Sequence, residues 1–458
     1  MKKSLFFLVL PCCLFLSLFS CSVAEQAQTT AAQVTNPTPR EAMFPVTKGL
    51  RPAASPEKVE MSAKRLALLD SHIQEYVDNG TMPGGVFLIA RQGQIVYNKN
   101  FGYKDLEKTD AYKKDDIFRL ASMTKALTTV SIMQLFEQGK LGLDDPIFYY
   151  IPAFAQSKVL DTFNPVDSSY TTVPVKTPIT IRHLLTHTSG ISYGVFNPGK
   201  IGAVYEKNDA NSFGLSHDEL NTQQMAARLG TVPLAFQPGT QYMYGLNMEL
   251  LGSIVEVVSG MPLNQYFKKN IFTPLGMTDT YFYLPKEKHS RLVPIYSYSQ
   301  EKQLVVADKT FGLDPDYPLK ADNNHYAGGG GLSGTTMDYA KFIQALCDGG
   351  SYNGARILGR KTLEVMTSDQ LPLLNAKGTG FSPLPGITYG LGFSLKTEQG
   401  QAWTPKSVGT FEWGGAFNTK FFIDPSEELI FVGMTQIIPF TRPDFWDRMY
   451  AIIYGAVE

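Results

Sequence analysis

The sequence predicts an α+β fold: an antiparallel sheet domain, flanked by helices and built from both ends of the chain, with an inserted helical domain. Three observations predict it. Runs of β-branched and aromatic residues lie near the start and near the end of the chain. Apolar residues at helical spacing dominate the centre. The 458 residues, 43% of them hydrophobic and 18% charged, can form one large core or two smaller ones.

The chain begins with a segment typical of export. Lys2 and Lys3 precede an apolar run at residues 5–19, which is the order of a signal peptide, and the run is too short to span a membrane comfortably. It ends at Cys21 in a sequence similar to the lipobox of bacterial lipoproteins, although Phe19 replaces the usual small residue. We therefore expect secretion across the inner membrane and a lipid anchor at Cys21 on the periplasmic face of the bacterial envelope. Secretion without lipidation is the alternative.

Composition divides the rest of the chain. Residues 22–58 are rich in Ala, Gln, Thr and Pro without apolar periodicity, which predicts a flexible linker; a segment packed along the domain is the alternative. We expect a signal peptide at 1–21, this linker, and a globular domain at 59–458 whose helical subdomain covers about 140–320.

Local patterns predict the elements in order. A helix is expected at 66–76, where apolar residues share one face, and Gly80 ends it. Two strands, 85–90 and 94–98, follow as a hairpin.

Helices then dominate the centre and strands return at the end. Helices are expected at 124–139, 181–186 and 246–258. The strands 419–423 and 429–435 are separated by a turn that contains Asp-Pro.

Charge and cysteine content exclude several functions. The 41 Lys and Arg balance 42 Asp and Glu without long blocks of one sign, so we expect a small-molecule substrate and no nucleic acid partner. We expect no cofactor and no metal. Cys12 and Cys13 lie in the signal segment and Cys347 is alone in the body of the chain, where an apolar helical pattern predicts a buried thiol and no disulfide.

The first candidate chemical pattern is Ser122 followed by Lys125 at the start of a helical segment. Positions i and i+3 share a helix face, so the two side chains meet. A helix N-terminus favours the Ser122 oxyanion and eases loss of the Lys125 proton, so Ser122 could act as a nucleophile. A Ser that caps a helix beside a surface Lys is the ordinary alternative.

Two further segments carry candidate groups. Tyr244 follows a turn and precedes a helix; it could act as a base if a nearby ammonium favours its phenolate, or it could simply cover the helix end. Gly414 and Gly415 let a backbone approach a ligand closely, and the N–H of Ala416 could join that of Ser122 in an oxyanion hole. A plain turn is the alternative there.

Two other features bear on the site. The long polar segment 193–230, which begins at Tyr193, is expected to form a wall of the substrate cleft. His183 and His187 are spaced i, i+4, but no Glu follows His183, so we expect them to be structural and not to bind a metal.

Taken in order, these motifs resemble the serine β-lactamase and penicillin-binding protein superfamily, in the branch of class C β-lactamases, family VIII carboxylesterases and D-aminopeptidases. The resemblance covers about residues 60–455 and includes segments 179–190, 274–277 and 328–333. It implies a β-lactamase/transpeptidase-like fold. It also implies roles for four residues: Ser122 as acylated nucleophile, Lys125 and Tyr244 as its proton-transfer partners, and Ala416 as an oxyanion donor.

This sequence departs from the penicillin-recognising pattern at two places. Leu246 stands where Tyr-x-Asn has its Asn. Asn247, one residue later, could face the site if the turn differs, but we expect it to cap the following helix. Trp413 with Gly414 and Gly415 replaces Lys-Thr-Gly, so an apolar wall stands where a cation would hold a carboxylate. Trp-Gly-Gly is typical of the superfamily's esterases.

We therefore expect a serine hydrolase that cleaves carboxylic esters through an acyl-enzyme, with Trp413, Gly414, Gly415 and Tyr193 as substrate-binding residues. One alternative is a D-amino acid peptidase or β-lactamase acting on cell-wall-like amides. Another is a non-catalytic protein that binds cell-wall fragments. Acylation by a penicillin would favour the first alternative, and failure of a fluorophosphonate to label Ser122 would favour the second.

Overall fold

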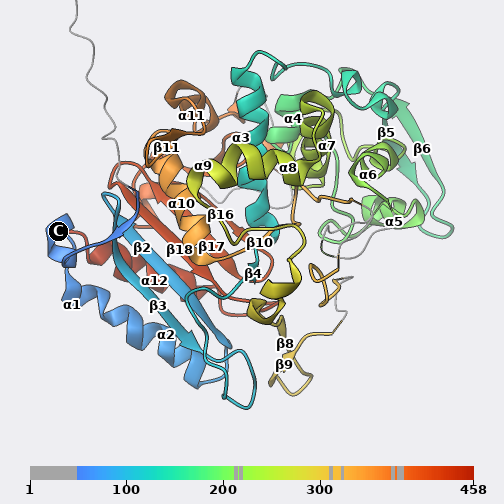
Figure 1. Cartoon of the computed structure of the whole chain (residues 1–458). Coiled ribbons are helices and arrows are strands. Elements are labelled where there is room, and N and C mark those ends of the chain that lie inside the picture. Colours follow the sequence, from blue (N-terminus) through green and yellow to red (C-terminus); the bar gives the residue numbers. More distant parts are fainter. Residues whose placement is uncertain are drawn as a thin grey trace, which may run out of the picture. The chain divides into compact units, whose positions relative to one another are not determined.

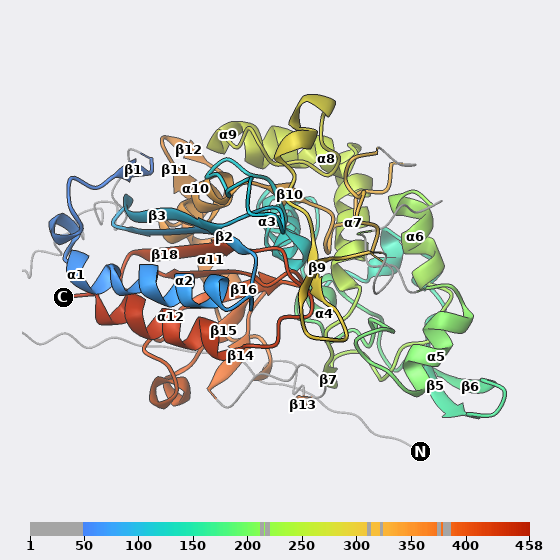
Figure 2. The ribbon, with the colours of Figure 1, turned by 90° about the horizontal axis from the view of Figure 1, so that it is seen from below.

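An eight-stranded sheet organises the domain, in the order β1-β3-β2-β18-β17-β16-β15-β14 (Figure 1, Figure 2). This computed structural model describes residues 49–458 except 211–214, 216–219, 309–312, 321–323, 373–376 and 379–385. The strands are β1 (Arg51–Pro52), β2 (Gly84–Arg91), β3 (Gln94–Gly102), β14 (Ile387–Tyr389), β15 (Ser394–Lys396), β16 (Phe411–Gly415), β17 (Thr419–Asp424) and β18 (Leu429–Met434). All neighbours pair antiparallel except β1 with β3. Because β2 pairs with β18, both ends of the chain build one sheet, as the sequence predicts.

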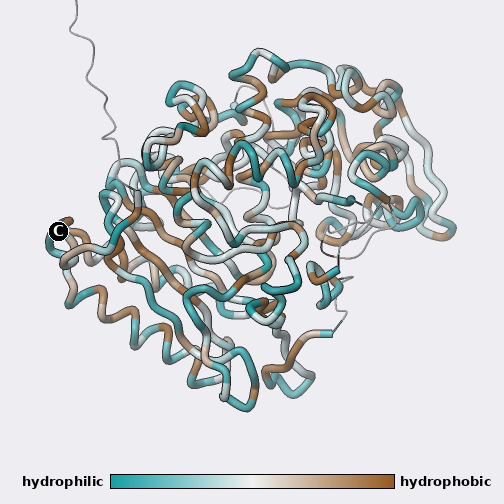
Figure 3. Tube along the Cα trace, in the orientation of Figure 1, coloured by the Kyte–Doolittle hydropathy of each residue, from teal (hydrophilic) through white to brown (hydrophobic). Residues whose placement is uncertain are grey.

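Both faces are buried at the centre of the sheet, which explains why β2 and β18 are apolar over most of their length. Along β2, Val86, Leu88 and Ala90 join one core cluster, while Phe87 and Ile89 join another. This alternation follows from the two-residue period of a strand. Hydropathy along the trace shows hydrophobic residues in both the strands and the helices that cover them (Figure 3).

Different helices cover the two faces. Helices α2 (Leu68–Asp78) and α12 (Asp444–Gly455) pack together on the face of Phe87, where Phe445 and Trp446 complete the cluster (Figure 2). Helix α10 (Thr336–Cys347) packs on β18, β17 and β2 from the other side. The fold therefore has a helix layer on each side of the sheet.

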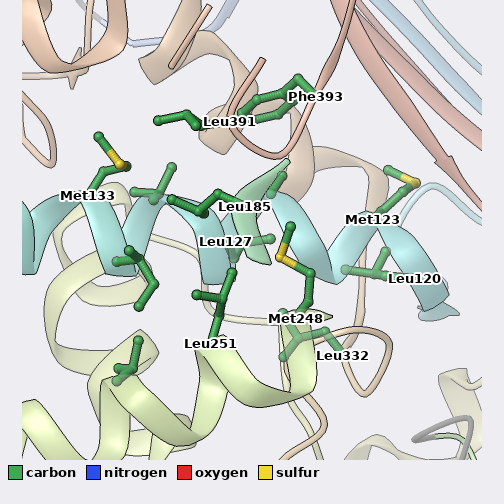
Figure 4. Close-up of a cluster of buried hydrophobic side chains, with 14 of the residues drawn as sticks. Leu120, Met123, Leu127, Met133, Leu185, Met248, Leu251, Leu332, Leu391 and Phe393 are labelled. Atoms are coloured by element: carbon green, nitrogen blue, oxygen red, sulfur yellow. The ribbon is translucent and has the colours of Figure 1, made fainter. Parts of the chain in front are cut away.

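Helix α3 (Thr124–Glu137) is the central element of the core cluster that contains Val86, Leu88 and Ala90. Its residues from Thr124 to Leu135 are all buried, as expected for a helix enclosed on every side. In Figure 4, Leu391 and Phe393 lie on one side of α3, and Met248 and Leu251 of α7 lie on the other. A helix packed all round cannot shift without opening the core, so its first turn is a rigid platform.

The central part of the described chain is not purely helical. Its helices are α4 (Ile181–Leu185), α5 (Lys200–Lys207), α6 (Thr222–Leu229), α7 (Asn247–Ser259), α8 (Leu263–Phe267) and α9 (Thr273–Leu275). A hairpin of β5 (Lys158–Phe163) and β6 (Tyr170–Pro174) also stands there, and the sequence analysis did not expect it. Within its two strands only Val159 and Leu160 are buried, so it lacks the long apolar runs that identify a core strand.

The remaining described elements are short. They are α1 (Ala63–Leu66), α11 (Arg360–Met366), β4 (Phe118–Arg119), β7 (Gln241–Tyr242), β8 (Tyr296–Tyr298), β9 (Leu304–Val306), β10 (Ser333–Gly334), β11 (Ser351–Tyr352), β12 (Ala355–Arg356) and β13 (Lys377–Gly378). Strand β4 pairs with β10, which brings the chain before Ser122 beside the segment after residue 331.

The predicted linker extends too far. Strand β1 pairs with Gln94 and Ile95 of β3, and a 3₁₀ turn at Pro56–Val59 carries the fully buried Val59. The packed domain therefore begins before residue 58. The predicted signal peptide, Cys21 and most of the linker lie outside the described residues. No helix in the described part of the chain is long and apolar enough to cross a membrane.

Candidate active site

Ser122 stands at the N-terminal end of the buried helix α3. A 3₁₀ turn at Ala121–Met123 precedes Thr124, the first residue of the helix. Ala121 has φ of 46°, a left-handed conformation that costs a residue with a Cβ roughly 1–2 kcal/mol. The turn is held by the Met123 N–H, which donates to the Leu120 carbonyl at 3.1 Å. This local strain places Ser122, partly exposed, where the helix dipole favours negative charge.

The three predicted reacting side chains meet at Ser122. The Tyr244 hydroxyl donates a hydrogen bond to Ser122 Oγ at 2.7 Å. Lys125 Nζ donates to the same oxygen at 3.1 Å, one helical turn away. Both distances are within hydrogen-bonding range, so Oγ can pass a proton to whichever neighbour is unprotonated.

Lys125 is fully buried and each of its three ammonium protons has an acceptor. Nζ donates to Ser122 Oγ at 3.1 Å, to the Gly329 carbonyl at 2.5 Å and to the Tyr193 hydroxyl at 3.3 Å. A buried ammonium is tolerable only with such partners. Nζ also lies 5.0 Å from the centre of the Tyr244 ring, within range of a cation–π contact. The lysine is therefore fixed in position.

Tyr244 belongs to an aromatic cluster. Its ring centre lies 4.9 Å from that of His187, 5.3 Å from Tyr193 and 5.5 Å from Trp413. Trp413, the third residue of β16, also contacts Tyr389 at 5.5 Å between ring centres. The wall beside the phenol is therefore apolar and carries an indole in place of a cation.

His187 supports the segment that carries Tyr244. It is fully buried, and its Nδ1 accepts the Gly245 N–H at 3.3 Å and lies 2.7 Å from Asn247 Nδ2. Burial lowers the pKa of His187 well below its ordinary value, and the Lys125 charge lowers it further. The imidazole is thus neutral and fixes the backbone directly after Tyr244.

Asn247 does not cap the helix that it begins. It is the first residue of α7, and its side chain makes no capping bond. Its Oδ1 instead accepts a hydrogen bond from Ser189 Oγ at 2.5 Å, and its amide faces His187. The predicted capping role is wrong because buried polar partners beneath the site take both ends of the amide.

The end of β16 closes against the turn that carries Ser122. A Cβ on Gly415 would lie 2.4 Å from the Leu120 carbonyl oxygen, so only glycine permits this approach. Gly415 pairs with Thr419 and is the last residue of β16, so Ala416 leaves the ladder as an exposed residue. Within the described chain, the N–H groups of Ser122 and Ala416 donate to no other protein atom.

Sequence reasoning missed Glu249. It is buried on α7, and its Oε1 accepts the Gly329 N–H at 3.0 Å, while the Gly329 carbonyl accepts from Lys125. One signal in the sequence could have found it: an acid five residues after Tyr244, between the apolar Met248 and Leu250.

The segment that begins at Tyr193 reaches the site. The Tyr193 hydroxyl faces Lys125 in the interior, whereas Phe196 is 40% exposed. The Phe196 ring centre lies 5.3 Å from that of Tyr193 and 6.4 Å from that of Tyr244. Two parts of this segment, 211–214 and 216–219, lie outside the described residues.

His183 and Cys347 have structural surroundings. His183 Nδ1 accepts the Thr180 N–H at 3.2 Å in a capping box, and burial lowers the pKa of His183 to about 4. Across the described ranges, no group of three or more His, Cys, Asp or Glu is placed to hold a metal ion. Cys347 is buried on α10, and burial raises the pKa of its thiol well above the ordinary value.

Comparison with known proteins finds a matching family and related sequences. A family model described as Beta-lactamase matches residues 69–452. Protein Rv1367c of Mycobacterium tuberculosis (strain ATCC 25618 / H37Rv) is 32% identical over 374 residues, which cover 80% of this chain and 89% of the relative. Lovastatin esterase of Penicillium rubens is 31% identical over 385 residues, covering 81% of this chain and 92% of that protein.

A solved structure has the same fold. EstCE1, described as a hydrolase with promiscuous acyltransferase activity, superposes with a TM-score of 0.72 at 27% sequence identity. The match covers 87% of this chain and 99% of EstCE1.

Proposed function

Because this chain belongs to the beta-lactamase family and has esterase and acyltransferase relatives, we propose that it is a serine hydrolase that cleaves carboxylic esters through an acyl-enzyme. One observation carries the proposal: Ser122 Oγ lies 2.7 Å from the Tyr244 hydroxyl and 3.1 Å from Lys125 Nζ. A nucleophile held between two proton-transfer groups is the arrangement that acyl transfer needs.

The reaction follows from these contacts. Ser122 Oγ attacks the ester carbonyl carbon, and its proton passes to whichever of Lys125 and Tyr244 is unprotonated, as a neutral amine or a phenolate. Negative charge develops on the carbonyl oxygen, where the N–H groups of Ser122 and Ala416 form the oxyanion hole. The C–O bond then breaks, and the alcohol leaves with the proton held by the pair. Water then attacks the acyl carbonyl carbon and gives a proton to the same pair. The bond to Ser122 Oγ breaks, Oγ regains a proton, and the acid is released.

Trp413 supports a neutral acyl group in the substrate. Its indole stands 5.5 Å from the Tyr244 ring, centre to centre, on the wall where penicillin-recognising relatives carry a lysine. An apolar wall favours alkyl or aryl acyl chains and offers no positive charge to bind a carboxylate. The same open site admits an alcohol in place of water, which agrees with the acyltransferase activity named for EstCE1.

The test compares ester with lactam. The purified protein and its Ser122→Ala variant are assayed with p-nitrophenyl acetate, p-nitrophenyl butyrate and a chromogenic cephalosporin. We expect ester turnover in the wild type, loss of at least about 10⁴-fold in the variant, and an intact cephalosporin. Cephalosporin turnover would favour an amide-directed hydrolase, and ester turnover that survives Ser122→Ala would contradict the mechanism.

Location is a separate part of the proposal, supported by the sequence of residues 1–21 alone. Export and acylation at Cys21 would tether the hydrolase to the cell envelope. Growth with radiolabelled palmitate tests it: label in the wild type and none in Cys21→Ala is expected, and label in neither would leave secretion without an anchor.

A further inference from the structure

A loop of four glycines, residues 328–331, passes between helices α3 and α7 beside Lys125. Thr128 Oγ1 on α3 donates to the Gly328 carbonyl at 2.6 Å, and the Tyr317 hydroxyl donates to the Gly331 carbonyl at 2.7 Å. The loop is therefore held from both sides.

Gly329 lies at the centre of this loop and is held at both of its backbone groups. Its carbonyl accepts Lys125 Nζ at 2.5 Å, the shortest of the three contacts that lysine makes. Its N–H donates to Glu249 Oε1 at 3.0 Å. The position of the lysine's strongest acceptor thus depends on where Glu249 holds Gly329.

Both partners are specialised for this contact. A Cβ on Gly329 would lie 2.4 Å from Glu249 Oε1 and 3.3 Å from the Tyr193 hydroxyl, so a larger residue would push the carboxylate and the loop apart. Glu249 is 4% exposed between the fully buried Met248 and Leu250, where an apolar side chain would be the ordinary choice. Burying a carboxylate there is unfavourable unless its oxygens are hydrogen-bonded.

A simpler explanation exists for an acid at this position. Glu249 lies in the first turn of α7, where negative charge complements the helix dipole. That explanation predicts an effect on stability alone. It gives no reason for the contact with Gly329, because a solvent-facing acid would complement the helix dipole equally well.

We propose that Glu249 is a positioning residue that, through Gly329, holds Lys125 in line with Ser122. The proposal rests on the proposed function, because it assigns Glu249 a part in the acylation of Ser122. Glu249 touches no reacting atom; it sets the direction from which Lys125 Nζ meets Oγ. Displacement of a proton-transfer group by about 1 Å costs on the order of 10²-fold in rate, so this support affects turnover more than binding.

The experiment compares two substitutions at Glu249 with one control. Glu249→Leu keeps the bulk and removes the acceptor, whereas Glu249→Gln keeps an acceptor oxygen and removes the charge. Glu256→Leu is the matched control, because Glu256 lies on the same helix and also accepts a backbone N–H, that of Leu263 at 2.9 Å, away from Ser122. Each protein is assayed for kcat and KM with p-nitrophenyl butyrate, for Ser122 labelling by a fluorophosphonate, and for thermal unfolding.

We expect Glu249→Leu to lower kcat and the labelling rate by about 10²-fold with KM changed by less than about threefold. Glu249→Gln should retain kcat within about fivefold, and Glu256→Leu should retain it fully. A folded Glu249→Leu protein with wild-type kcat would overturn the proposal, and so would a Glu249→Gln protein as slow as Glu249→Leu.

If Glu249→Leu does not fold, Gly329→Ala decides, because its Cβ displaces the same contact from the other side. A loss of about 10²-fold in kcat supports the proposal, and wild-type kcat in folded Gly329→Ala overturns it. Failure of the proposed function would be recognised separately, since the wild type itself would then neither hydrolyse the ester nor react with the fluorophosphonate.

Discussion

The two walls of the site differ in how firmly the fold holds them. We define the buried wall as Lys125, Tyr193, Glu249 and Gly329; its three side chains are at most 4% exposed and hydrogen-bonded to neighbours. We define the open wall as Phe196, Trp413, Gly414, Gly415 and Ala416, of which Phe196 is 40% exposed and Ala416 is also exposed. In the proposed function, the buried wall holds the proton-transfer group in place and the open wall selects the acyl group.

The largest effect is expected from the groups that touch Ser122 Oγ. Tyr244→Phe keeps the ring and removes the hydroxyl, so kcat for p-nitrophenyl butyrate should fall by about 10³-fold, the usual contribution of a proton-transfer group. The kcat of Lys125→Ala should fall at least as far, because this substitution also leaves the Gly329 carbonyl without its hydrogen-bond donor. Tyr242→Phe, two residues before Tyr244, is the control and should keep most of the activity. Loss in the control equal to that in Tyr244→Phe would refute a specific role.

An effect of intermediate size is expected on stability at low pH. Burial holds the pKa of His183 at about 4, below its ordinary value of 6.5, so the folded state resists protonation that the unfolded state accepts. The free energy of unfolding should therefore fall as pH drops from about 6.5 to about 4, by up to about 3 kcal/mol from this residue. Urea unfolding of the wild type and His183→Gln at several pH values measures it. Parallel pH curves for the two proteins would contradict the assignment.

The smallest effect is expected at the open wall. Butyrate has two more methylenes than acetate, and a buried methylene contributes about 0.8 kcal/mol, so Trp413 can favour butyrate by about 10-fold in kcat/KM. Trp413→Ala should reduce that preference while keeping most of the turnover of acetate. Trp403→Ala is the matched control, because Trp403 is 76% exposed. An unchanged ratio of butyrate to acetate in Trp413→Ala would place the acyl chain elsewhere.

The sequence predicts the parts of the fold that have long apolar patterns. The hairpin of β2 and β3 and the final strands β17 and β18 are predicted within a few residues. Strands β2, β17 and β18 are almost wholly buried and rich in apolar residues, and β3, which is mostly part-exposed, contains the run Ile95-Val96-Tyr97. Three-residue strands such as β14 and β15 give no such pattern, and they are set by pairing with β16. The predicted linker extends too far toward residue 58, because β1 joins the sheet through backbone pairing, which composition does not reveal.

Some residues of the site are likewise predictable from the sequence and others are not. Ser122 and Lys125 have a recognisable local spacing, the resemblance to the β-lactamase superfamily indicates Tyr244, and the structure brings the three together. Glu249 and Asn247 depend on partners far along the chain, Gly329 and Ser189, so their contacts follow from tertiary packing alone.

The most direct test of the central claim is mass spectrometry of the protein quenched during turnover of p-nitrophenyl butyrate. The account predicts one butyryl group on the peptide that contains Ser122, slower loss of that group in Tyr244→Phe, and no adduct in Ser122→Ala. Steady turnover with no adduct on Ser122, or an adduct on a different residue, would contradict it.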